Sequence, residues 1–297
     1  MGSKIAYYLF IYPISKLPYP LLYGLSNFLF FLIYRLIGYR KDVVLNNIKG
    51  SFPEKSSEEH EKIMKDFYRH FCDFILESIK SFTLSKEEAL KRFKLINPEV
   101  VDNIYNEGRD IIFVGGHYNN WEILAISVGL QMKTLPFGIY KPLSNQFFDR
   151  IVRESRERFR LKLCPVKEVK EMITTDFGEP KGTIFAVDQS PSNPNKSYWT
   201  TFLNQETPLL YGAEKYAKEL NLPVVFCRID KTKRGYYTGT MEVICDDPSK
   251  TEYGEITQLC NIEVEKQVQE DPQYWLWSHK RWKHKRPEGT VLHERID

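Results

Sequence analysis

Residues 111–122 read IIFVGGHYNNWE: an apolar run of four residues leads through two glycines and a histidine into the pattern of a helix. The apolar run predicts a buried strand, and Trp121–Leu130 is expected to be helical. In an open α/β sheet, sites form where the strands deliver the chain into helices. This stretch therefore predicts the fold class and, around His117, the position of a site.

Alternating strand and helix patterns continue from this stretch toward the C-terminus. Strands are expected at 135–139, 183–187, 224–229 and 236–244, and helices at 145–159, 209–220 and 255–270. Upstream, Ser56 or Ser57 is expected to cap a long amphipathic helix that runs to about Phe82, and Ser85 to cap a short one. The alternation predicts an α/β fold, in which a mixed sheet with substantial parallel pairing is flanked by helices.

Composition excludes several classes of protein. The chain has 297 residues, of which 42% are hydrophobic and 27% charged, which excludes general disorder and a polytopic membrane protein. Its net charge of +3 is too small to indicate a nucleic-acid-binding protein. The five cysteines have long gaps and form no C-x-x-C pair, so we expect buried thiols in a reducing compartment.

The N-terminus departs from this average. In residues 19–38, only Pro20, Ser26, Asn27 and Arg35 are not apolar, aromatic or glycine. Basic residues follow, which predicts a membrane anchor over residues 1–40 with its basic end in the cytoplasm. A single tilted span and a helical pair lying in the interface both fit, and a core helix of a soluble protein is the alternative. The catalytic domain is then expected at 41–297, with a helical lead-in at 41–105 and an α/β core at 106–297.

The histidine motif suggests acid–base chemistry. His117 is expected in the turn before the helix, with Asn119 or Asn120 capping that helix, so that Glu122 can fold back to the imidazole. A carboxylate on one ring nitrogen fixes the tautomer and leaves the other nitrogen as a general base. The alternative is a structural histidine in a strand-to-helix turn. A metal site is not expected, because H-E-x-x-H is absent.

Two basic stretches point to anionic partners. Residues 150–170 carry a local charge of +5, and residues 280–286 add five Lys or Arg. Most of these side chains are expected on solvated faces, and the rest could contact anionic lipid, a phosphorylated sugar or an acidic carrier protein. The interleaved Trp275, Trp277 and Trp282 favour an interfacial location.

Several motifs together resemble the bacterial lipid A late acyltransferase family, the lauroyl and myristoyl transferases. They are LPYPLLY at 17–23, YR at 39–40, NNI at 46–48, SFP at 51–53, GHYNNWE at 116–122, YKP at 140–142, DQ at 188–189 and PQYWLWSHKRWK at 272–283. The resemblance implies a fold similar to the glycerophosphate acyltransferases. It also implies transfer of a fatty acyl chain from acyl carrier protein, or from acyl-CoA, to a hydroxyl of a lipid A precursor. The reaction would take place at the cytoplasmic face of the bacterial inner membrane, without a cofactor.

The resemblance also assigns roles to residues. His117 corresponds to the family's base, Glu122 to its carboxylate partner and Arg156 to an arginine near the oxyanion or a phosphate. Asp188, Asn120 and Lys141 complete the expected substrate-binding set. An E-G-T-R type motif is not found at 184–190, which argues against glycerol-3-phosphate or lysophosphatidate as acceptor.

Two alternatives remain at this stage. The same chemistry could act on another lipid, such as an aminoacyl lipid or a lysolipid. The chain could also be a catalytically silent membrane protein that binds lipid or acyl carrier protein, which the intact His117 and Glu122 argue against.

Overall fold

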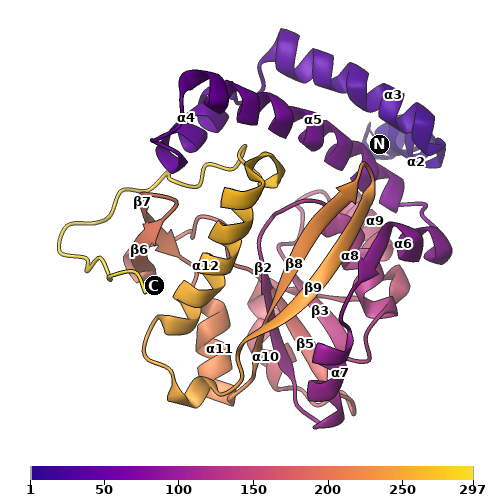
Figure 1. Cartoon of the computed structure of the whole chain (residues 1–297). Helices are drawn as coiled ribbons and strands as arrows, with labels where there is room; N and C mark the ends of the chain where they lie inside the picture. Colours follow the sequence, from indigo (N-terminus) through magenta and orange to yellow (C-terminus); the bar gives the residue numbers. More distant parts are fainter. Residues whose placement is uncertain (1, 297) are drawn as a thin grey trace.

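A seven-stranded sheet lies at the centre of the computed structural model, which describes residues 2–296 (Figure 1). In order across the sheet, the strands are β1 (Phe93–Leu95), β9 (Tyr236–Cys245), β8 (Val224–Lys233), β2 (Ile111–Gly115), β5 (Lys181–Ala186), β3 (Leu135–Tyr140) and β4 (Lys162–Pro165). Neighbouring strands pair in parallel, except for the antiparallel β8–β9 hairpin. The predicted mixed α/β fold is confirmed.

The central strand β2 is buried on both faces. Ile112 and Val114 belong to the larger core, which includes residues of α11 (Gly212–Leu220) and α12 (Glu255–Glu270). Ile111 and Phe113 belong to a second core, which includes residues of α7 (Glu99–Asn106). Because side chains alternate along a strand, a continuous apolar run serves two layers of helices.

The remaining helices after β2 are short. They are α8 (Trp121–Ser127), α9 (Gln146–Arg156) and α10 (Val169–Thr174). The helix expected at 209–220 begins only at Gly212, because Leu209 ends strand β7 (Gln205–Leu209). Strand β7 pairs with β6 (Tyr198–Phe202) in a separate antiparallel hairpin that was not predicted.

Three helices lead into the sheet: α4 (Lys41–Ser51), α5 (Ser57–Ser81) and α6 (Lys86–Arg92). The long helix α5 begins at the expected cap: of the two candidates, Ser56 is the N-cap, and it forms a complete capping box with Glu59. At α6 the Ser85 side chain accepts from the backbone N–H of Glu88. Helix α4 falls within the segment 41–105, where a helical lead-in was expected.

The apolar N-terminus folds as two helical segments. The first combines α1 (Gly2–Ala6), a π-helical turn and α2 (Tyr12–Lys16), and the second combines α3 (Tyr19–Phe30) with a π-helical continuation to Ile37. By length and composition, Tyr19–Ile37 is the one described segment able to cross a membrane, a weak criterion that core helices also meet. In the structure it lies against α5 (Figure 1). The expected domain division at residue 40 stays a prediction.

Glycine at position 182 of β5 makes room for an aromatic side chain. A Cβ placed there would collide with the ring of Phe113 on the neighbouring strand. We therefore predict that Gly182→Ala lowers the free energy of unfolding by about 1–3 kcal/mol, as overpacked cores do. Chemical denaturation measures this loss. Gly212→Ala is the control, because its Cβ would meet Phe185 at an ordinary 3.6 Å. Equal stability of the two variants would contradict the packing argument.

Candidate active site

His117 and Asp188 meet beyond the ends of two adjacent parallel strands. In the β2–β5 ladder the last residues of the two strands, Gly115 and Ala186, pair with each other. Two residues further along the chain, His117 follows β2 and Asp188 follows β5. Nδ1 of His117 lies 2.7 Å from Oδ1 of Asp188, and the His117 backbone N–H donates to Oδ2 at 2.7 Å. The register of the sheet thus sets the imidazole–carboxylate pair.

The surroundings of Asp188 hold its carboxylate in a buried position, where it is 2% exposed. Trp275 donates its indole N–H to Oδ2 at 2.8 Å. On the other side, a Cβ at Gly116 would lie 3.2 Å from both Oδ2 and a methyl of Val264. Glycine at this position therefore lets the carboxylate approach the turn closely.

Glu122 does not make the hydrogen bond to the imidazole that we expected. Asp188 makes that bond, while Glu122 accepts from Arg156 in a two-pronged ion pair, with Nη2–Oε1 at 2.5 Å and Nε–Oε2 at 3.0 Å. The reason is that Glu122 lies in the first turn of α8, next to α9, which carries Arg156. The structure brings together the predicted His117, Glu122, Arg156 and Asp188, but in two separate pairs.

Asn120 is buried at the start of α8 and supports the turn that precedes it. It is 1% exposed, and its side-chain oxygen accepts from the backbone N–H of Ile123, which confirms the predicted cap. Its amide nitrogen donates to Glu77 at 2.6 Å. Both ends of the side chain are bound to protein, and contact of Asn120 with substrate stays a prediction.

Lys141 and Gln189 also differ from the expectation. Lys141 is exposed just after β3 and is not among the residues that line the cavity described below, so its substrate contact stays a prediction. Gln189, quoted only as part of a motif, places its Nε2 3.1 Å from Nε2 of His117. The Gln189 amide donates to the nitrogen that a general base would use. Its place directly after Asp188 is the signal that could have suggested this.

The aromatic residues of the C-terminal motif pack inside the protein. Trp275 is 2% exposed and Trp277 is fully buried, while Trp282 is half-buried and donates to Thr207. Arg281 is also fully buried. The interfacial location that we expected for these tryptophans is wrong, because they build the core around the site.

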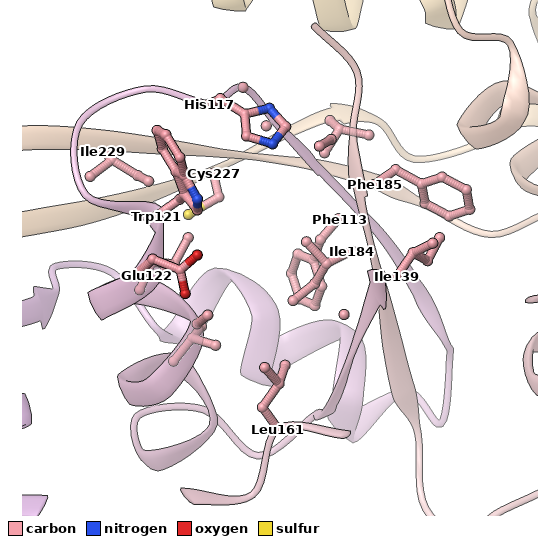
Figure 2. Close-up of a pocket in the computed structure, with 18 of the residues that line it drawn as sticks. Phe113, His117, Trp121, Glu122, Ile139, Leu161, Ile184, Phe185, Cys227 and Ile229 are labelled. Carbon is pink, nitrogen blue, oxygen red and sulfur yellow. The ribbon is translucent and has the colours of Figure 1, made fainter. Parts of the chain in front are cut away.

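An apolar cavity of about 200 Å³ opens beside the imidazole. In Figure 2 the imidazole of His117 lies at the top, Glu122 on the wall below it and Leu161 at the bottom. The other apolar wall residues include Phe113, Leu124, Val128, Met132, Ile139, Leu163, Ile184, Phe185, Ile229 and Met241. Arg156 adds a charged group to this wall. The cavity suits a long apolar group whose reactive end stops at His117.

The charges of the pair shift both pKa values. Burial lowers the pKa of His117, but attraction to Asp188 and the hydrogen bond to it outweigh burial, so the net pKa lies above its ordinary value. Burial raises the pKa of Asp188, yet the same pairing and the Trp275 bond hold it at about 2. Asp188 thus stays ionised and stabilises a protonated imidazole.

Together these features define a class of enzyme. An imidazole held by a buried carboxylate can take a proton from a hydroxyl, and the adjoining cavity receives an apolar chain. Such a site fits the transfer or hydrolysis of acyl groups.

Comparison with known proteins identifies the family. A family model described as bacterial lipid A biosynthesis acyltransferase matches residues 3–284. The lauroyltransferase of lipid A biosynthesis from Escherichia coli is 24% identical over 282 residues, covering 93% of this chain and 90% of its own. The palmitoleoyltransferase of the same organism is 20% identical, covering 92% and 88%, and a lipid A biosynthesis acyltransferase from Haemophilus influenzae is 23% identical, with the same coverage. The chain belongs to the bacterial lipid A biosynthesis acyltransferase family and is an acyltransferase.

Asp188→Asn should separate the charge of the carboxylate from its shape. His117 accepts a proton only when neutral, so wild-type kcat/KM should rise with pH through a value above about 6.5, the ordinary imidazole pKa. Without the Asp188 charge, burial is no longer outweighed and lowers the His117 pKa. The rise of kcat/KM with pH should therefore occur at lower pH in the variant. The plateau should fall by about 10²- to 10⁴-fold, because the imidazole loses its orientation.

A pH profile of acyl transfer measures both effects. Asp176→Asn, in an exposed loop, is the control for loss of an aspartate charge. An Asp188→Asn profile that overlays the wild type would contradict the assigned pair.

Proposed function

We propose that this enzyme transfers a fatty acyl chain from the thioester of acyl carrier protein to a hydroxyl of a lipid A precursor, at the cytoplasmic face of the inner membrane. The observation that carries the proposal is the Asp188-bound imidazole at the mouth of an apolar cavity. The printed names of the relatives, which act in lipid A biosynthesis, support the acceptor.

In the proposed mechanism His117 acts as general base through Nε2. The acceptor hydroxyl displaces the Gln189 amide from Nε2, gives up its proton there, and attacks the thioester carbonyl. The tetrahedral intermediate then expels the carrier thiolate, which takes the proton back from the imidazolium. A positioned base contributes about 10²- to 10⁴-fold. The cycle needs no metal ion and no covalent enzyme intermediate.

Arg156 is the proposed partner of the oxyanion. Two of its guanidinium nitrogens, Nε and Nη2, bind Glu122. No described group of the protein binds the third, Nη1, which can therefore donate to a substrate atom. The fork between Glu122 and Arg156 holds the guanidinium in one orientation on the cavity wall. Donors fixed before the reaction are worth about 10²- to 10³-fold each. Glu122 thereby serves catalysis by orienting Arg156.

The apolar N-terminus supports attachment to a lipid surface. Exposed large apolar side chains gather on its helices: Ile5, Leu9, Phe10, Leu21, Phe28, Phe31, Leu36 and Ile37. Exposed apolar side chains gathered on two neighbouring helical segments are expected to be covered by lipid. Since α3 packs along α5, we propose that α3 lies in the plane of the membrane–water interface.

An acyl transfer assay tests the function. Purified enzyme receives acyl carrier protein thioester or acyl-CoA, with and without an underacylated lipid A precursor. We expect thioester consumption only with the glycolipid, and His117→Ala should lose it by at least about 10²-fold while remaining folded. His293→Ala, whose ring stacks on Tyr198 near the C-terminus, is the matched control.

Other outcomes of the assay separate the alternatives. Transfer only to a different lipid would replace the acceptor, and no turnover with either donor would refute the enzyme proposal. Mass spectrometry of lipid A from cells that lack the gene gives an independent answer. We expect the loss of one secondary acyl chain, and unchanged lipid A would exclude the proposed acceptor.

The cavity should set the length of the acyl chain. Ala125 lines its wall, and Leu161 lies at its bottom (Figure 2). Ala125→Phe should shift the preference to shorter acyl donors, whereas Leu161→Ala should shift it to longer ones. Each methylene gained or lost in the cavity is worth about 0.8 kcal/mol. Competition between thioesters of different length measures kcat/KM ratios. Shifts of the same sign in both variants, or no shift, would show that the chain binds elsewhere.

A further inference from the structure

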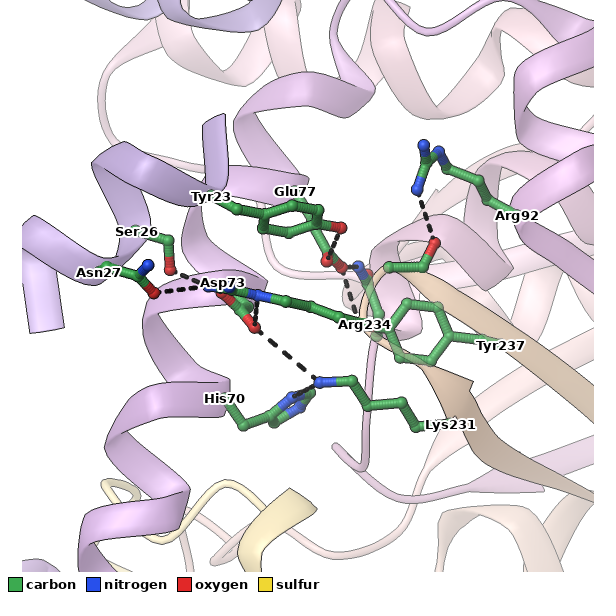
Figure 3. Close-up of polar contacts among 12 residues, drawn as sticks. Tyr23, Ser26, Asn27, His70, Asp73, Glu77, Arg92, Lys231, Arg234 and Tyr237 are labelled. Atoms are coloured by element: carbon green, nitrogen blue, oxygen red, sulfur yellow. Dashed lines mark hydrogen bonds and ion pairs between the residues drawn. The ribbon is translucent and has the colours of Figure 1, made fainter. Parts of the chain in front are cut away.

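The inner face of α5 carries a buried polar stripe (Figure 3). His70, Asp73 and Glu77 are spaced three and four residues apart and are each at most 7% exposed. Residues three and four apart share one face of a helix. This face meets α3, the tip of the β8–β9 hairpin and the start of α8.

The two carboxylates of the stripe have different partners. Asp73 binds the Arg234 guanidinium at 2.6 and 2.9 Å and accepts from the Ser26 hydroxyl at 2.6 Å. Glu77 accepts only neutral donors among the described residues: Tyr23 at 2.8 Å, Tyr237 at 2.8 Å and Asn120 at 2.6 Å. A buried carboxylate without a paired cation depends on every such donor.

One of these donors reaches the active site. Asn120 donates its side-chain N–H to Glu77, and its side-chain oxygen accepts from the backbone N–H of Ile123 in the first turn of α8. The preceding residue Asn119 has φ of +52°, a left-handed conformation that needs support. His117 and Glu122 stand on either side of this pair. Whatever fixes Asn120 therefore fixes the turn between them.

Another donor belongs to the apolar helix α3. Tyr23, Ser26 and Asn27 form its polar edge, and they bind Glu77, Asp73 and Arg234 respectively. The opposite side of the helix exposes Leu21 and Phe28. If α3 moved away from α5, Glu77 would lose the Tyr23 hydroxyl, one of its three hydrogen-bond donors. The remaining donors, Asn120 included, would then have to rearrange around a buried carboxylate.

We infer that Glu77 is a positioning residue of the reaction: it holds the His117–Glu122 turn through Asn120 and holds α3 through Tyr23. Docking of the apolar N-terminal helix and order in the catalytic turn are thereby coupled. This inference rests on the proposed role of His117, and it goes beyond it by assigning a function to a group that touches no substrate.

Variants of the two linking side chains test the coupling. Glu77→Ala should lower kcat by about ten- to hundredfold with KM unchanged, because small displacements of a catalytic group are costly. Glu77→Gln should restore most of this loss, since its amide oxygen still accepts from Asn120 and its amide nitrogen can donate to the Tyr23 hydroxyl. Tyr23→Phe should lower kcat by about threefold or more. Tyr34→Phe, on the same helical segment but packed on Tyr68, is the matched control and should leave kcat unchanged.

Hydrogen exchange gives a readout that needs no substrate. Amides 117–124 should exchange faster in Glu77→Ala and Tyr23→Phe than in Tyr34→Phe. If the two linkers act along one path, the double variant of Tyr23→Phe and Glu77→Ala should lose no more kcat than Glu77→Ala alone.

The outcomes separate this inference from the proposed function. Absence of acyl transfer by the wild type would refute the function, and exchange of the turn would still decide the coupling. An active wild type in which Tyr23→Phe matches Tyr34→Phe in kcat and in exchange would overturn the coupling alone. A rise in KM at constant kcat would overturn it as well. If Glu77→Ala does not fold, the comparison of Tyr23→Phe with Tyr34→Phe decides the coupling.

Discussion

The parallel register between β2 and β5 is the constraint on which the site depends. Gly115 and Ala186 pair with each other, so β2 and β5 end side by side at the same edge of the sheet. Two residues later, His117 and Asp188 are close enough to form a hydrogen bond. The distance between imidazole and carboxylate is therefore set by a hydrogen-bonded ladder of backbone. A site held by regular elements keeps its geometry more closely than one held by loops.

Burial of Asp188 has a cost, which the C-terminal segment offsets. The carboxylate receives the Trp275 indole N–H in addition to two groups of His117, so three fixed donors replace water. The same segment backs the turn, where the Asn119 N–H donates to the Tyr274 carbonyl. The aromatic residues near the C-terminus thus support the His117–Asp188 pair and the turn beside it through packing and hydrogen bonds.

Local sequence patterns predicted most of the helices and strands, but not which side chains form pairs in the site. The apolar run at 111–114 and the serine before the long helix led to correct expectations of a strand and a helix cap, because both signals lie within a few residues. Glu122 appeared to be the partner of His117 because it is five residues away, whereas Asp188 is 71 residues away. Only the strand order, which inserts β5 beside β2, makes the distant residue the neighbour. Strands β1 and β4, at three and four residues, are too short to give a periodic signal.

Helix α3 is apolar on average, yet Tyr23, Ser26 and Asn27 give it a polar edge. This edge limits how the helix could be placed in a membrane. A perpendicular span would carry Tyr23, Ser26 and Asn27 into lipid and would leave Asp73 and Glu77 buried without those donors. Each buried group left without its partner costs about 1–3 kcal/mol, and more when it is charged. A helix docked along α5 keeps these bonds and turns its apolar side outward. The polar contacts therefore support the proposed location of α3 in the plane of the interface over a perpendicular span.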